Sequence, residues 1–124
     1  MPWSYSQRSG ILSRDGAPVA ACYSGFGDGK NNPALQQVHD LGPIPRGRWG
    51  IGDPEYVTDV GPHGPFVLPL RPREGTETYG RDHFLIHGDS LQHSGQASHG
   101  CIVTDRHTRE AIAASHDQDL EVVA

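Results

Sequence analysis

The sequence predicts a mostly β domain, a sandwich or barrel with one or two short helices. Gly and Pro occupy 26 of the 124 positions, 16 and 10 respectively, and both residues interrupt long helices. Short apolar or alternating runs separated by turn residues recur about every ten residues, a spacing typical of antiparallel β architectures. A chain of this length has room for one core, so we expect residues 1–124 to form a single domain.

There are nine such runs, and each is an expected strand. They span residues 3–7, 11–13, 19–23, 48–51, 56–60, 66–70, 84–87, 101–103 and 120–123. The step Asp15-Gly16 tolerates the positive φ that a tight hairpin turn needs, so the runs on either side of it are expected to pair. A helix is expected near residues 106–115, where Thr104 or Asp105 can cap the first turn. A second short helix is expected to begin at Pro33, since Pro suits a first helical position.

The charge and hydropathy pattern excludes several classes of partner. Ten Lys and Arg against 15 Asp and Glu give a formal charge of −5, and no basic block is present, so we expect no nucleic-acid partner. No stretch approaches the roughly 20 consecutive apolar residues that span a bilayer, and residues 1–4 lack a secretory signal pattern. The segment 25–30 lacks the spacing of a phosphate-binding loop. We expect no membrane span and no cofactor.

The residues suited to catalysis concentrate between positions 83 and 107. Five of the eight histidines fall there, together with Cys101, which follows Ser98-His99-Gly100. A thiol of pKa about 8.5 is mostly protonated near neutral pH and needs an adjacent imidazole to become a nucleophile. His87 ends an apolar run 14 residues before Cys101 begins the next one. If the two runs are neighbouring strands, the thiol and the imidazole share one site.

Glycines stand beside both of these residues. Gly100 would let a substrate carbonyl approach, and the N–H groups of Gly100 and Cys101 would bind a developing oxyanion. Gly88 leaves its carbonyl open to the far ring nitrogen of His87, with Asp89 as the competing acceptor.

Other interpretations compete with this one. A Cys at the start of a strand is often a small buried hydrophobe, and Cys22, inside an apolar run, is expected to be one. Of the arginines before the cluster, one or two would suit a bidentate contact with a substrate carboxylate, and Arg81 is nearest in sequence to His87. A zinc site, which would make the protein a zinc-dependent hydrolase, is a further alternative, although positions 83 and 87 of a strand lie about 13 Å apart. The histidines available for it are His83, His87, His93 and His99.

The motifs resemble those of a known family. His87-Gly88 followed by Ser98-His99-Gly100-Cys101-Ile102 resembles the signature of the YkuD-type L,D-transpeptidases, and the chain is most similar to the type VI secretion L,D-transpeptidase effectors. The further segments that support this resemblance are 29–33 (GKNNP), 42–47 (GPIPRG), 63–65 (HGP), 80–81 (GR) and 84–90 (FLIHGDS). The common signature continues with Arg or Asn after the Cys-hydrophobic pair, where this chain has Val103-Thr104.

The resemblance implies a mostly β, YkuD-like catalytic domain that acts on the stem peptides of peptidoglycan. It implies that Cys101 is the nucleophile and His87 its base, with His99 as a hydrogen-bonding neighbour or an alternative base. The residues implied to orient the site or bind the oxyanion are Gly88, Ser98 and Gly100, and those implied to contact substrate are Arg81, Asp89 and Ser90.

The implied reaction begins with attack on the carbonyl of the L-centre of meso-diaminopimelate. Terminal D-Ala leaves and a thioester remains on the cysteine. Transfer to water is L,D-carboxypeptidase action, transfer to a free D-amino acid is exchange, and transfer to the amine of a neighbouring stem forms a crosslink.

The resemblance also implies a route of delivery. A secretion apparatus would inject the effector into the periplasm of a competing bacterium, without a signal peptide, and the producing cell would hold an immunity protein. The alternative from another functional class is a non-catalytic module that keeps the fold and binds the cell wall or travels as toxin cargo.

Overall fold

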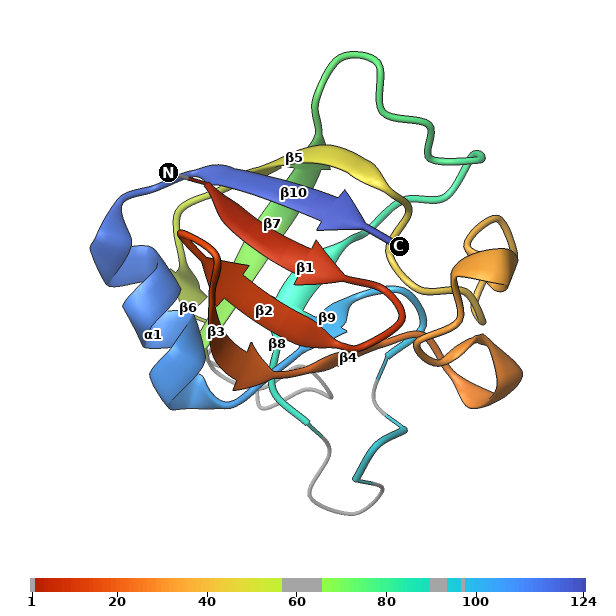
Figure 1. Ribbon diagram of the computed structural model, residues 1–124, viewed down its shortest axis with the longest axis horizontal. Helices are drawn as coiled ribbons and strands as arrows, with labels where there is room; N and C mark the ends of the chain where they lie inside the picture. Colours follow the sequence, from red (N-terminus) through yellow and green to blue (C-terminus); the bar gives the residue numbers. More distant parts are fainter. Residues whose placement is uncertain (1, 57–65, 90–93, 97) are drawn as a thin grey trace.

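The computed structural model describes residues 2–56, 66–89, 94–96 and 98–124 (Figure 1). The strands are β1 (Trp3–Ser6), β2 (Ile11–Arg14), β3 (Ala17–Ala21), β4 (Tyr23–Ser24), β5 (Gly47–Ile51), β6 (Glu55–Tyr56), β7 (Phe66–Pro72), β8 (Leu85–His87), β9 (Ile102–Val103) and β10 (Asp119–Val123). The helices are the α-helix α1 (Arg106–Ser115) and the 3₁₀ turns η1 (Gly27–Gly29) and η2 (Pro33–Leu35). The expected mostly β class is confirmed.

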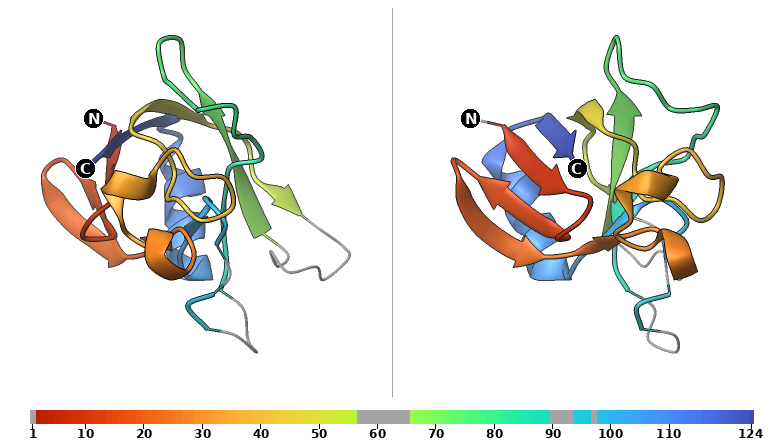
Figure 2. Two further views of the ribbon diagram at one scale, coloured as in Figure 1. Left: turned by 90° about the vertical axis from the view of Figure 1, so that its right-hand side faces the viewer. Right: turned by 45° about the vertical axis from the view of Figure 1, so that its right-hand side comes forward.

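The strands form a sheet that curls back on itself. Its order is β3-β2-β1-β10-β5-β7-β8-β9-β4, and β6 pairs with β7 beside this path. The two outermost strands, β3 and β4, follow each other along the chain with Cys22 alone between them. The sheet is therefore nearly closed, and the two further views show its halves facing each other across the interior (Figure 2).

The local predictions hold where turn or cap chemistry determines them. β2 and β3 pair antiparallel across Asp15 and Gly16, which have φ values of 53° and 79°. Pro33 begins a short 3₁₀ helix, capped by the side chain of Asn32. Of the expected strand at 56–60, positions 57–60 lie outside the described residues.

The antiparallel arrangement is only partly correct, because two of the pairings are parallel. β1 pairs parallel with β10, and β8 pairs parallel with β9. A parallel pair needs a long return connection, and residues 88–101 supply it between β8 and β9. Apolar spacing predicts strands but contains no information on their relative direction.

The core fills the interior of this curled sheet. Trp49 on β5 is fully buried, donates its indole N–H to the Pro45 carbonyl at 3.0 Å, and meets the Phe84 ring edge-on at 4.9 Å between centroids. Ile86 on β8 and Ile102 on β9 belong to the same buried cluster. The strands that frame the motif residues are therefore fixed from behind by the main core.

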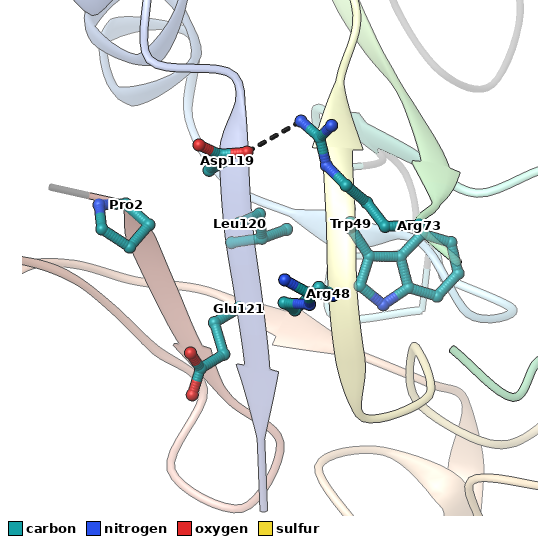
Figure 3. A pocket seen from close by; sticks show the side chains of 7 residues that line it. All are labelled: Pro2, Arg48, Trp49, Arg73, Asp119, Leu120 and Glu121. Atoms are coloured by element: carbon teal, nitrogen blue, oxygen red, sulfur yellow. Dashed lines mark ion pairs between the residues drawn. The ribbon is translucent and has the colours of Figure 1, made fainter. Parts of the chain in front are cut away.

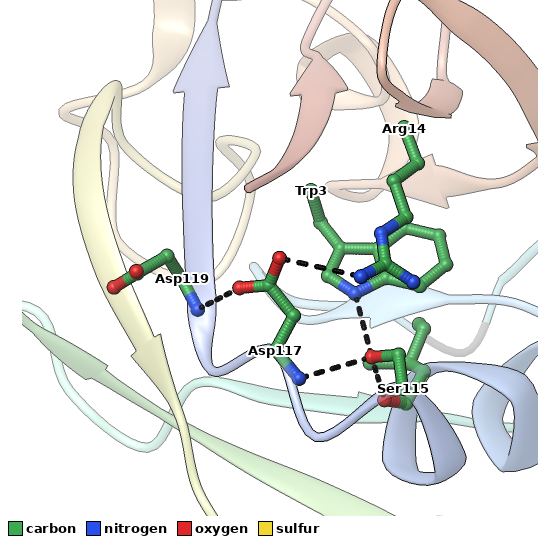
Figure 4. Close-up of polar contacts among 6 residues, drawn as sticks. Trp3, Arg14, Ser115, Asp117 and Asp119 are labelled. Atoms are coloured by element: carbon green, nitrogen blue, oxygen red, sulfur yellow. Dashed lines mark hydrogen bonds and ion pairs between the residues drawn. The ribbon is translucent and has the colours of Figure 1, made fainter. Parts of the chain in front are cut away.

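α1 packs against β7 and β8 and buries Ile112 in the core. Its C-terminal end is tied to the sheet by a polar network (Figure 4). The Trp3 indole donates to the Ser115 hydroxyl at 3.2 Å, and Arg14 pairs with Asp117 at 3.5 Å. Within the described ranges, no helix has the length and apolar character needed to cross a membrane.

Asp105 is the residue that caps α1, and its removal tests how the helix is held. Its carboxylate accepts from the Thr108 N–H at 2.8 Å, so Asp105→Ala is expected to lower the free energy of unfolding by about 1 kcal/mol at pH 7. Bonds from Thr108 hold the pKa of Asp105 below its usual value. The difference between variant and parent is present above the ordinary carboxyl pKa and shrinks as pH falls through the lowered one.

Urea titrations at several pH values measure this difference. Asp119→Ala is the control, because Asp119 forms an exposed ion pair with Arg73, and such pairs contribute about 0–1 kcal/mol. A loss in the Asp105→Ala variant that does not shrink as the pH falls would contradict the assignment of the cap.

Candidate functional site

The motif residues meet where β8 and β9 run side by side. The parallel register pairs Ile86 with Ile102 and His87 with Val103, which confirms that the two runs are neighbouring strands. Cys101 directly precedes β9. Side chains alternate between faces along a strand, and if this alternation is continued by one residue to Cys101, Cys101 and His87 share the face opposite to Ile86 and Ile102. Two residues along the strand and one strand spacing separate them, so their Cα atoms are about 8 Å apart.

The imidazole of His87 is fully buried, with 0% of the residue exposed. Its Nδ1 lies 2.7 Å from the carbonyl oxygen of Gly88. A carbonyl only accepts, so this contact places the ring proton on Nδ1 and leaves Nε2 as the basic nitrogen. The backbone of His87 is fixed as well, because its carbonyl accepts from the Thr104 N–H at 3.0 Å.

Asp89, the competing acceptor for the His87 ring, makes other contacts. Its carboxylate accepts from the Tyr23 hydroxyl, from the Ser94 hydroxyl at 3.0 Å and from the Gly95 N–H. Lys30 lies over the Tyr23 ring and donates to the Gly95 carbonyl at 3.1 Å. These contacts join Asp89 to Tyr23, Ser94 and Gly95. Ser90 lies outside the described residues.

Cys101 is a free cysteine and is only 8% exposed. Burial raises the pKa of its thiol to about 11, and a hydrogen bond from the Leu85 backbone and the positive charge of Arg81 offset part of this effect. The thiol lies 3.5 Å from the His83 carbonyl, to which it can donate. The resting thiol is therefore neutral at pH 7, and a base must take its proton before it can attack.

Ser98 is the central hydrogen-bonding residue of the turn that leads into Cys101. It is completely buried, at 0% exposure, and its hydroxyl accepts from the Gly25 N–H at 2.9 Å and the Gly100 N–H at 3.1 Å. The same hydroxyl donates to the Cys101 carbonyl. Three bonds to one atom fix the backbone on both sides of the nucleophile candidate.

The role of Gly100 differs from the one that the sequence predicts. Its N–H is used by Ser98 and is not free for an oxyanion, so of the two expected donors only the Cys101 N–H keeps that assignment. The need for glycine has another cause. Its φ is +137°, and a Cβ there would lie 2.5 Å from an Arg81 nitrogen.

Arg81 also needs a correction. The sequence suggested a side chain that binds a substrate carboxylate, but the residue is only 7% exposed. Its two terminal nitrogens already donate to four backbone carbonyls, those of Gln36, Gly42, Pro43 and His99. The guanidinium is thus a structural donor inside the protein.

The side chains of His99 and His83, two other histidines of the cluster, make contacts of their own. The exposed ring of His99 stacks on Phe26 at 5.1 Å, and its Nδ1 lies 2.9 Å from the Asp40 carbonyl. The His83 side chain is 91% exposed and lies beside Asp82. Across the described part of the chain, no three His, Cys, Asp or Glu side chains gather around a possible metal position. His93 lies outside the described residues.

Ser24 is a site residue that the sequence analysis missed. It is buried on β4, its hydroxyl donates to the Gly100 carbonyl at 3.0 Å, and it accepts from the Ile44 N–H at 2.8 Å. Nothing near it in sequence signals this role. Only the pairing of β4 with β9, which sets Ser24 opposite Ile102, brings it to the turn.

A hollow on another side of the molecule belongs to a different surface. It lies along β10 and β5 and is lined by Pro2, Arg48, Trp49, Arg73, Asp119, Leu120 and Glu121. The ion pair between Arg73 and Asp119 crosses it at 2.8 Å (Figure 3). None of the motif residues lines this hollow.

Ser98 offers a direct test of how the turn is held. Ser98→Ala leaves two buried N–H groups without their acceptor, and each such group costs about 1–3 kcal/mol. We expect the free energy of unfolding to fall by about 2–4 kcal/mol in urea titrations. Ser94→Ala, at an exposed position, is expected to stay within about 0.5 kcal/mol of the parent. Equal effects of the two changes would show that Ser98 does not support the turn.

Comparisons with known proteins support the fold and identify the family. An L,D-transpeptidase from Mycobacterium smegmatis has a similar structure, with a TM-score of 0.50 and 17% sequence identity over 98% of this chain and 58% of that one. At this identity the likeness shows the fold, and it confirms the expected YkuD-like architecture. The chain thus spans little more than half of that longer protein.

No curated protein matches the sequence. The family model described as the Tlde1 domain matches residues 19–124, which is most of the chain and includes every motif residue discussed above. The protein therefore belongs to the Tlde1 domain family, the type VI secretion L,D-transpeptidase effectors.

Proposed function

We propose that residues 1–124 form one catalytic unit, a cysteine L,D-transpeptidase that cuts and exchanges the stem peptides of peptidoglycan. Cys101 is the nucleophile and His87 is its base. The observation that supports this most strongly is the parallel β8–β9 pair, which sets both residues on one face. The Gly88 carbonyl fixes the ring so that its basic nitrogen is Nε2.

The first half of the reaction acylates the thiol. His87 takes the proton of the neutral Cys101 thiol, and the sulfur attacks the carbonyl of the L-centre of meso-diaminopimelate. The oxyanion of the tetrahedral intermediate accepts from the Cys101 N–H. When the intermediate collapses, the bond to the terminal D-Ala nitrogen breaks and that nitrogen takes the proton from His87. A thioester remains on the sulfur and free D-Ala departs.

The second half transfers the acyl group to an acceptor. His87, now neutral, removes a proton from the incoming water or amine as it attacks the thioester. Water gives a tripeptide stem, and a free D-amino acid gives an exchanged tetrapeptide. The amine of a neighbouring stem gives a crosslink. The thiol regains its proton from His87 at the end of the cycle.

The biological setting follows from the family. We propose that a secretion apparatus delivers the protein to the periplasm of a target bacterium and that the producing cell holds a cognate immunity protein. Trimming and exchange would then remove the tetrapeptide donors that the target needs for wall growth. Asp89 and Ser90 follow the His87-Gly88 step in sequence and remain the proposed substrate contacts.

The assignment of the nucleophile is tested by matched cysteine variants. Cys101→Ala is expected to abolish release of D-Ala from tetrapeptide muropeptides, because it removes the thiol that forms the thioester in the proposed reaction. Cys22→Ala, which removes the other, half-buried cysteine, is expected to retain at least half of the activity. Mass spectrometry of the muropeptides measures both.

Two outcomes would contradict the proposal. Turnover by the Cys101→Ala variant would exclude the thiol as nucleophile. Binding of the parent protein to sacculi without any change in muropeptide mass would favour the alternative of a non-catalytic wall-binding module.

The resting state of the thiol gives a second test. In a Cys22→Ala background, Cys101 is the single thiol, and its rate of alkylation by iodoacetamide follows the thiolate fraction. Since burial raises the thiol pKa to about 11, the rate is expected to increase steadily from pH 7 to pH 10. A plateau reached below pH 8 would instead reveal a preformed thiolate–imidazolium pair.

A further inference from the structure

Arg81 lies at the junction of two segments that the chain brings together around the nucleophile turn. Its terminal nitrogens donate to the carbonyls of Gln36, Pro43 and Gly42 on one side, the last two at 2.8 Å, and to the His99 carbonyl at 3.2 Å on the other. Four acceptors saturate the four N–H bonds of these nitrogens. The guanidinium therefore has one fixed position.

The same guanidinium contacts both the turn and the core. A Cβ at Gly100 would approach an Arg81 nitrogen to 2.5 Å and the Phe84 ring to 3.1 Å. The centroid of the Phe84 ring is 5.3 Å from the guanidinium carbon. Phe84 in turn packs on the buried Trp49. Gly100, Arg81 and Phe84 thus pack together at the edge of the core.

The positive charge of the Arg81 guanidinium acts on the Cys101 thiol. Burial lowers the pKa of Arg81 itself, but guanidinium stays protonated in proteins. Its positive charge lowers the pKa of the Cys101 thiol and opposes the effect of burial. Asp40, an exposed residue, is the neighbouring anion that interacts with Arg81.

Within the described residues, three histidines and one carboxylate also lie in this region. His87 lies on the same face, as the proposed base, and His99 is engaged with the Asp40 backbone at 2.9 Å. His83 and Asp82 are exposed beside each other. Arg81 is the buried cation whose charge acts on the thiol, and the buried Arg109 lies beside Gly88.

We propose that Arg81 is a positioning residue of the active site, which holds the turn of residues 98–101 in place and keeps a fixed positive charge behind the Cys101 sulfur. The inference rests on the proposed role of Cys101 as nucleophile. It also explains why an arginine that cannot reach a substrate carboxylate stands beside the site. The acidity of the thiol can be measured without substrate, so this inference and the proposed reaction can fail separately.

The test measures alkylation of Cys101 by iodoacetamide at pH 9 in the Cys22→Ala background, with circular dichroism to confirm that each variant is folded. At this pH the rate is proportional to the thiolate fraction. Arg81→Gln removes the charge and is expected to slow alkylation about tenfold, as loss of a nearby unit charge raises a thiol pKa by about one unit. Arg81→Lys keeps the charge, so alkylation is expected to stay within about threefold of the parent. It loses the two terminal guanidinium nitrogens that bind the backbone carbonyls, so D-Ala release is expected to fall.

A second variant, Asp40→Asn, is expected to change the alkylation rate in the opposite direction and to preserve the fold. Asp40 is exposed and has a φ of 64°, a conformation that Asn adopts readily. Asp40→Asn removes the anion that partly neutralises Arg81, so alkylation at pH 9 is expected to be about two- to threefold faster. If Arg81→Gln fails to fold, this measurement still tests whether the charge of Arg81 acts on the Cys101 thiol.

Alkylation that is slower in the Gln variant, nearly unchanged in the Lys variant and faster in the Asn variant would support the proposal. Rates equal to the parent in folded Arg81→Gln and in Asp40→Asn would overturn it, because Arg81 would then act on stability alone. Unchanged D-Ala release in Arg81→Lys would show that the hydrogen bonds of the Arg81 guanidinium do not position the turn.

Discussion

The parallel pairing of β8 and β9 is the constraint on which the rest of the site depends. Ile86 and Ile102 face each other in register and are held in the main core. Strand alternation, continued by one residue from β9 to Cys101, then puts His87 and Cys101 on the opposite face. A shift of one residue would turn either side chain to the other face, so the apolar pair determines which face carries the two proposed catalytic residues.

Buried polar atoms hold the turn of residues 98–101, which carries the proposed nucleophile. Ser98, Ser24 and Arg81 bind the turn through its N–H and carbonyl groups. Such bonds are costly to lose inside a protein, and together they stabilise the φ of +137° at Gly100. The turn is thus rigid before any substrate arrives, a condition that favours catalysis because no reorganisation is required.

Much of this could be predicted from the sequence, since several signals are local. The Asp15-Gly16 turn and the cap of α1 depend on residues next to each other, and the spacing of His87 and Cys101 fitted a strand pair. The direction of that pair and the roles of Ser24 and Arg81 could not be predicted. They depend on contacts between segments far apart in the chain, such as Arg81 with residues 36–43. Such contacts leave no periodic pattern.

The central claim is that Cys101 becomes acylated by a stem peptide. The most direct measurement is the mass of the protein after brief incubation with a tetrapeptide muropeptide and an acid quench that preserves a thioester, followed by peptide mapping. We expect an added mass equal to the muropeptide less D-Ala, located on the peptide that contains Cys101. Release of D-Ala with no adduct at Cys101, under conditions that preserve a synthetic thioester, would contradict the account.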